Sequence, residues 1–158
     1  NTIMDLLILV VLVLTSGLLA GFYFAWWCSC MVGLREVSDA GFVGSMQAIN
    51  RSLPNARFAI PFFAPMILGA VATWLTFADG QLTAGWWSVA ALVLSLITFG
   101  ITAAGNVPLN NALEAAGRTD DTAARRAIER PWVRLNNLRT ATSILAFAAA
   151  VAALVRLD

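Results

Sequence analysis

The chain has 158 residues, of which 59% are hydrophobic and only 12% are charged. Soluble domains carry about a quarter of charged residues, so this composition excludes an ordinary soluble protein. The net charge of +1 argues against a nucleic acid as partner, and the lack of histidine excludes a histidine-ligated haem and removes the commonest metal ligand. We therefore expect no metal and no other cofactor.

Four apolar stretches are each long enough to cross a bilayer as a helix, which takes roughly 20 residues. They run approximately over 3–31, 58–78, 84–104 and 132–155. We predict an all-α polytopic membrane protein, an up-and-down bundle of four transmembrane helices that forms one domain over 1–158. The first stretch has no basic leading region and exceeds the roughly 7–15 apolar residues of a secretory signal, so we expect a retained anchor.

Small residues on the first helix predict close packing. Gly17 and Gly21 lie four apart, a spacing that lets another helix approach in lipid. Together with the alanine face of the last helix, they favour a homo-oligomer. Cys28 and Cys30 point in different directions on a helix, so we expect free, helix-packing cysteines rather than a disulfide or a metal site.

A short amphipathic helix is predicted in the first connection, between Arg35 and Leu53. Its apolar residues, among them Phe42, Met46 and Ile49, repeat at helical spacing, and Ser38 or Asp39 suits its N-cap. Pro54 ends it, because proline disfavours helix in the residue before it. Asp79 and Gly80 then mark the turn between the second and third membrane helices.

The second connection is predicted to contain two further short helices. Pro108 interrupts the third membrane helix, and residues 109–116 form a short helix that ends at Gly117. Asp120, Asp121 or Thr122 caps the next helix, which runs through Arg130. Pro131 suits either the first turn of a new helix or a bend in a continuous one.

The distribution of arginine predicts the orientation in the membrane. All ten basic residues are arginines, and only Arg156 lies away from the two longer connections. The others are Arg35, Arg51 and Arg57 in the first connection and Arg118, Arg125, Arg126 and Arg130 in the second, with Arg134 and Arg139 just inside the next helix. Positively charged segments resist translocation, so we expect both connections on the cytoplasmic side and both termini outside.

Polar and aromatic residues converge at the cytoplasmic ends of the four predicted helices. These are Tyr23, Trp26, Trp27, Arg57, Phe58, Thr102, Asn106, Trp132, Asn136 and Arg139. Asn136 and Arg139 are expensive to expose to lipid, so we expect them to face the bundle interior. They either line a pocket or only hold the helices together by hydrogen bonds. Arg134 is expected to extend to the lipid phosphates.

At these positions the chain resembles the anthrone oxygenase family, small four-helix membrane proteins of bacteria and fungi. The resemblance rests on Met46–Arg51, Asn55 and Phe58, the stretch Asn106–Leu113, and Trp132 with Asn136, Arg139 and Thr140. It implies the inner (plasma) membrane of a bacterial cell. It also implies a lipophilic aromatic or quinone-like ligand, attacked by dioxygen without metal or flavin.

The resemblance also implies roles for individual residues. Arg139 and Arg51 are the catalytic candidates, because a guanidinium stabilises an enolate or superoxide by charge-assisted hydrogen bonds. The ligand-binding candidates are Tyr23, Gln47, Asn50, Asn106, Asn110, Trp132 and Asn136. Asparagine amides would orient ligand oxygens, and the aromatic side chains would stack on its rings.

Catalysis needs a base, and the sequence offers no obvious one. The candidates are Asp39, Glu129 and the acidity of the ligand itself. Where family members commonly carry Trp and His, this chain has Leu135 and Asn137. Two functions therefore stay open: a cofactor-independent oxygenase, and a non-catalytic subunit of a membrane complex that binds lipid or a partner protein. A solute carrier is disfavoured, since the chain has no inverted repeat and no acidic residue at mid-membrane.

Overall fold

The computed structural model describes residues 2–157, and helices make up nearly all of this range. In chain order they are α1 (Thr2–Ala25), the π-helix η1 (Trp26–Cys30), α2 (Met31–Arg35), α3 (Asp39–Ser52), α4 (Ala56–Ala78), α5 (Leu82–Ile101), the π-helix η2 (Thr102–Asn106), α6 (Val107–Ala115) and α7 (Asp121–Val155). No strand occurs between residues 2 and 157, so the all-α prediction is confirmed.

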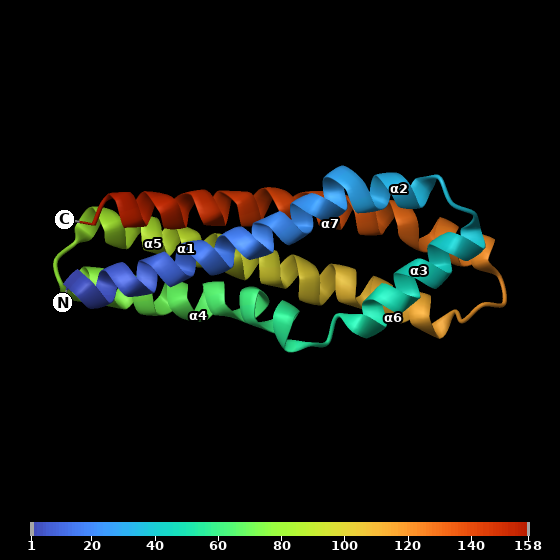
Figure 1. The fold of residues 1–158 in the computed structure, drawn as a ribbon, viewed down its shortest axis with the longest axis horizontal. Coiled ribbons are helices and arrows are strands. Elements are labelled where there is room, and N and C mark those ends of the chain that lie inside the picture. The colour runs from blue at the N-terminus through green and yellow to red at the C-terminus, as the bar shows by residue number, and fades with distance from the viewer. Residues whose placement is uncertain (1, 158) are drawn as a thin grey trace.

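Four helical spans are long and apolar enough to cross a membrane: Ile3–Arg35, Ala56–Ala78, Leu82–Ala115 and Asp121–Val155. They form a bundle in which α1 packs against α4 and α7, and α5 packs against the same two helices (Figure 1). The chain ends and the α4–α5 turn lie at one end of the bundle, and α2, α3 and α6 lie at the other (Figure 1). We call the latter the arginine-rich end, defined by residues 35–57 and 116–134.

The third membrane helix does not end at Pro108, contrary to the prediction. Val107 donates its backbone N–H to the carbonyl oxygen of Thr102, five residues earlier, so the helix widens into η2 just before the proline. Pro108 then falls in the first turn of α6, directly after this wider turn. The third span therefore continues to Ala115.

The fourth membrane helix begins at Asp121, well before the predicted start at Trp132. The Asp120 carboxylate caps it by accepting a hydrogen bond of 2.9 Å from the backbone N–H of Ala123. Pro131 lies inside this continuous helix, so of the two alternatives for this proline, the start of a new helix is wrong. The first span is also longer than predicted, because η1 joins α1 to α2 and carries the helix on to Arg35.

The predicted caps and turns of the connections are confirmed. The Ser38 hydroxyl accepts from the backbone N–H of Gly41 at 3.1 Å and starts α3 at Asp39. Gly80 and Gly117 have φ angles of 75° and 62°, the left-handed conformation that a turn after a helix requires.

The small residues of α1 behave differently from one another. A Cβ at Gly17 would lie 3.1 Å from the ring of Phe147, so this glycine does let α7 approach closely, as predicted. A Cβ at Gly21 would meet nothing within 4 Å. Cys28 and Cys30 are free, as predicted, but both are exposed, so the prediction that they pack between helices of this chain is wrong.

Candidate functional site

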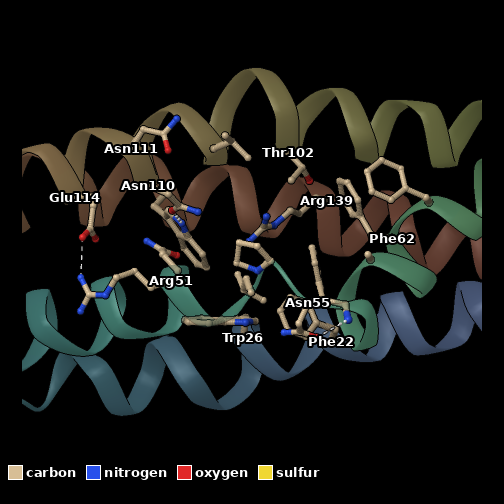
Figure 2. Close-up of a pocket in the computed structure, with 18 of the residues that line it drawn as sticks. Phe22, Trp26, Arg51, Asn55, Phe62, Thr102, Asn110, Asn111, Glu114 and Arg139 are labelled. Carbon is tan, nitrogen blue, oxygen red and sulfur yellow. Dashed lines mark hydrogen bonds and ion pairs between the residues drawn. The ribbon is translucent and has the colours of Figure 1, made fainter.

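A cavity of about 720 Å³ lies at the arginine-rich end, bounded by the end of α1, the α3–α4 connection, η2, α6 and α7 (Figure 2). This volume is typical of pockets that hold a small organic molecule. The cavity is lined by Phe22, Trp26, Asn50, Arg51, Leu53, Pro54, Asn55, Ala56, Phe58, Ala59, Phe62, Phe63, Thr102, Val107, Asn110, Asn111, Glu114, Trp132 and Arg139.

Aromatic rings form much of the cavity wall. The ring of Phe58 lies 5.2 Å from those of both Phe22 and Phe62, centroid to centroid. Trp26 and Trp132 contact each other at 5.1 Å. Ring pairs at these distances hold one another in place, so the wall is a rigid apolar surface suited to flat rings.

Arg139 is a buried cation in the wall of this cavity (Figure 2). Only 5% of its surface is exposed, and its guanidinium carbon lies 4.4 Å from the centroid of Tyr23 and 5.0 Å from that of Trp132. Its Nε donates to the Asn136 side-chain oxygen at 3.1 Å. Among residues 2–157, no carboxylate lies within ion-pair distance of it, and its two Nη atoms have no acceptor. Its charge is therefore available to a ligand.

Two amide side chains belong to the wall of the same cavity, those of Asn50 and Asn110. The side-chain oxygen of Asn110 accepts a hydrogen bond of 2.8 Å from the indole N–H of Trp132. The oxygen of this amide is therefore engaged, and its nitrogen is the remaining donor. The amide nitrogen of Asn50 is buried and has no partner among the described residues. Buried donors are normally paired, so the amide nitrogen of Asn50 is an unusual unpaired group in this wall.

An ion pair lies at one end of the cavity. Arg51 Nη1 contacts Glu114 Oε1 at 2.7 Å, and it links α3 to α6. Figure 2 shows this pair at one end, Phe62 at the other and Arg139 between them. The cavity is therefore polar toward the arginine-rich end and apolar toward the middle of the bundle.

The family model for the anthrone oxygenases matches residues 56–149, more than half of the chain. The chain belongs to the anthrone oxygenase family. No curated protein and no solved structure matches it. The matched region runs from the start of α4 far into α7. It therefore includes Asn110, Trp132 and Arg139 and leaves out the residues that α1 and α3 contribute to the cavity.

The structure brings five of the predicted site residues to the cavity: Asn50, Arg51, Asn110, Trp132 and Arg139. The other four are Tyr23, Gln47, Asn106 and Asn136, and they lie behind its wall. Tyr23 and Asn136 contact the guanidinium of Arg139 from outside the cavity. Contact of any of the nine with a ligand stays a prediction.

Gln47 and Asn106 pair with the backbone of neighbouring helices. Gln47 Nε2 donates to the carbonyl oxygens of Leu113 and Gly117, at 2.9 and 3.0 Å, and so satisfies the end of α6. Asn106 Nδ2 lies 3.4 Å from the carbonyl oxygen of Trp132. In this member of the anthrone oxygenase family, these two amides therefore hold helices together.

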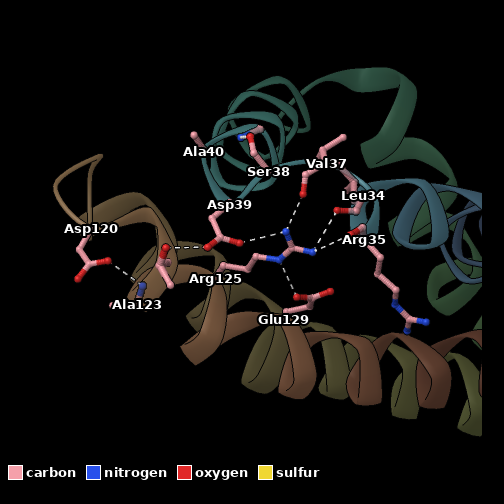
Figure 3. A network of polar contacts seen from close by, with 12 residues as sticks. Leu34, Arg35, Val37, Ser38, Asp39, Ala40, Asp120, Ala123, Arg125 and Glu129 are labelled. Atoms are coloured by element: carbon pink, nitrogen blue, oxygen red, sulfur yellow. Dashed lines mark hydrogen bonds and ion pairs between the residues drawn. The ribbon is translucent and has the colours of Figure 1, made fainter.

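Sequence reasoning named Phe58 but missed Phe62 and the one acid of the cavity wall, Glu114. Phe58 and Phe62 lie four residues apart, as do Asn110 and Glu114, and this spacing was the available signal. Glu114 is the one carboxylate among the residues that line the cavity. The candidate bases Asp39 and Glu129 lie elsewhere, bound to Arg125 (Figure 3).

Leu135 and Asn137, the two positions where the resemblance implies Trp and His in other members, lie outside the cavity. Asn137 lines a separate groove with Trp27 and Arg35. Leu135 lies against Gly105, where a Cβ would come within 2.7 Å of its side chain. A histidine at position 137 would therefore belong to that groove and would not reach into the cavity from this backbone.

Proposed function

We propose that this protein binds a lipophilic aromatic or quinone-like ligand in the cavity, with a ligand oxygen on Arg139. The observation that carries the proposal is the burial of this guanidinium in the wall of an aromatic cavity, without a carboxylate partner within residues 2–157. A buried charge is unfavourable unless a counter-charge or acceptors surround it. A ligand carbonyl or enolate oxygen would supply both.

The two ends of the cavity support one orientation of the ligand. Its rings would lie against Phe58 and Phe62, and its oxygens would point toward Arg139, Asn50 and Asn110. We also propose that the arginine-rich end lies on the cytoplasmic side, as positively charged connections usually do. Phe62 would then mark the part of the cavity that reaches into the membrane (Figure 2).

For an anthrone, the proposed reaction is oxygenation without a cofactor. The ligand loses a proton from its central CH₂ group, and Arg139 stabilises the resulting enolate. Dioxygen attacks that carbon; one oxygen atom becomes the new ketone, and the other leaves as water with the two hydrogens of the CH₂ group. The anthrone supplies all the electrons, so no external reductant is needed.

The proton can leave by two routes. The first is through Glu114, whose carboxylate is paired with Arg51 at the polar end. The second is directly to water, since stabilisation of the enolate by the guanidinium favours ionisation of the ligand. Neither route needs a histidine.

The test is binding and oxygen consumption with anthrone itself, on the full chain in detergent. Binding is followed by quenching of tryptophan fluorescence, because Trp26 and Trp132 line the cavity. Arg139→Gln is expected to weaken binding at least about tenfold, the effect of losing a charge-assisted hydrogen bond. Arg134→Gln, on the exposed side of the same helix, is the matched control and is expected to bind as the wild type does.

Equal binding by the wild type and Arg139→Gln would contradict the proposal. If Arg139→Gln does not fold, Arg139→Lys keeps the charge without the planar fork and is expected to bind with intermediate affinity. Oxygen consumption is compared with the autoxidation of anthrone in empty micelles.

A non-catalytic role is the second candidate. The ion pair between Glu114, the one carboxylate that lines the cavity, and Arg51 favours it. Glu114 is held by Arg51 at 2.7 Å, so no free base lines the cavity. Such a protein would bind anthrone with the same dependence on Arg139, but it would not raise the oxygen consumption above that of empty micelles. The two readouts therefore separate a binding protein from an oxygenase.

A further inference from the structure

A second groove of about 240 Å³ runs between the first span and α7. It is lined by Trp27, Met31, Val32, Arg35, Val133, Asn136 and Asn137. No residue lines both this groove and the aromatic cavity. The pair formed by Asn136 and Arg139 separates them, since the first lines the groove and the second lines the cavity.

The groove is apolar at one end and polar at the other. Trp27 and Val32 are each 51% exposed, which leaves large apolar surfaces at its rim. Arg35 follows Trp27 by eight residues in a continuous helical span, or roughly 12 Å along the axis. Tryptophan prefers the membrane–water interface, so a lipid headgroup in this groove would lie between the levels of Trp27 and Arg35.

The guanidinium of Arg35 has no carboxylate partner among the described residues. Two of the acidic side chains nearby, Asp39 and Glu129, pair with Arg125 at 3.2 and 2.8 Å, and the third, Glu36, is exposed and forms no ion pair among the described residues. Figure 3 shows Arg125 within this network and the side chain of Arg35 extending away from it, alongside α7. Arg35 therefore lines the groove without an ion-pair partner among the described residues.

The adjoining surface of α7 is also basic. Arg126, Arg130 and Arg134 repeat every four residues, and all three are exposed and without a carboxylate partner among the described residues. This repeat places them along one stripe of the helix. The positive charge of the stripe adds to that of Arg35 and attracts an anion that carries an apolar chain.

We propose that this groove binds one anionic phospholipid. Its phosphate contacts Arg35 and the amide of Asn137, and the first part of an acyl chain lies along Trp27 and Val32. The positive charge of the groove favours an anionic headgroup, as in other basic pockets between membrane helices. The apolar rim contacts the acyl chain. This site is independent of the proposed function, because it uses none of the residues that line the aromatic cavity.

Native mass spectrometry of the full chain in detergent tests the proposal. Phosphatidylglycerol and phosphatidylcholine with identical acyl chains are titrated separately. The wild type is expected to bind phosphatidylglycerol in one tight site, and Arg35→Gln is expected to weaken this site about fivefold, the effect of one cation near the headgroups. Arg156→Gln, which removes an exposed arginine at the opposite end of the bundle, is the matched control and is expected to keep the site.

Asn137→Asp is a second variant, which places a negative charge beside the proposed phosphate and is expected to weaken phosphatidylglycerol more than phosphatidylcholine. Equal affinity for the two lipids in the wild type would overturn the proposal. So would unchanged phosphatidylglycerol binding in both Arg35→Gln and Asn137→Asp. Displacement of the lipid by millimolar inorganic phosphate would show that only the charge is recognised and would also overturn it.

Discussion

The guanidinium carbon of Arg139 lies 4.4 Å from the centroid of the Tyr23 ring, which covers it on the side away from the cavity. This contact joins α7 to α1 and leaves the Nη atoms of the arginine without an acceptor among the described residues. A guanidinium that stacks on a ring face still has N–H donors available for hydrogen bonds, whereas a guanidinium paired with a carboxylate donates them to that carboxylate. Tyr23 therefore orients Arg139 without neutralising it.

Replacing Tyr23 tests this contact. Tyr23→Phe keeps the ring and loses only the 3.4 Å contact of the hydroxyl with Thr102, so the free energy of unfolding is expected to fall by less than about 1 kcal/mol. Tyr23→Leu removes the ring from a fully buried position and is expected to lower it by about 2 kcal/mol or more. The measurement is denaturant unfolding in mixed micelles. Equal losses in the two variants would show that the ring face does not matter.

Gln47 is expected to act through stability and not through a ligand. Gln47→Leu leaves the carbonyl oxygens of Leu113 and Gly117 without their donor, so the free energy of unfolding is expected to fall by about 1–3 kcal/mol. Gln47→Glu keeps the shape but replaces the donor by an acceptor, and it is expected to be at least as unstable. Both variants should bind anthrone with unchanged affinity below their melting temperature. A selective loss of anthrone binding would instead assign Gln47 to the site.

Arg125 is expected to hold the α2–α3 connection onto α7. It donates to Val37 and Asp39 at the start of α3 and pairs with Glu129 on its own helix (Figure 3). Arg125→Gln is expected to lower the free energy of local opening by about 2 kcal/mol. Amide hydrogen exchange at residues 37–43 would then be roughly 30-fold faster. Arg126→Gln removes the exposed neighbour and is the control. Faster exchange in both variants would attribute the effect to charge alone.

Asp5 is expected to destabilise the bundle. It is 1% exposed, and neither carboxylate oxygen has a hydrogen-bond partner in the described part of the chain. Burying a polar group without a partner is unfavourable, so Asp5→Leu is expected to raise the free energy of unfolding by about 1–3 kcal/mol. Asp5→Asn should have a smaller effect, because the amide is also unpaired. A lower melting temperature for Asp5→Leu would mean that this carboxylate has a stabilising contact.

The sequence by itself determined the four spanning helices, because the length and apolar character of each stretch are local properties. It also located the ends of α3 and α6, where Ser38 and Gly117 act on the backbone within a few residues. Arg139 was placed at the site from the sequence, since a charge on a membrane helix must face the interior.

Only the tertiary structure decided which polar side chains reach the cavity. Asn106 and Asn110 lie four residues apart, yet their roles differ: one amide contacts the backbone of α7 and the other lines the cavity. Helical spacing fixes the direction of a side chain only relative to its own helix. Whether that direction meets a cavity or another backbone depends on how the neighbouring helix packs, and no local pattern encodes that.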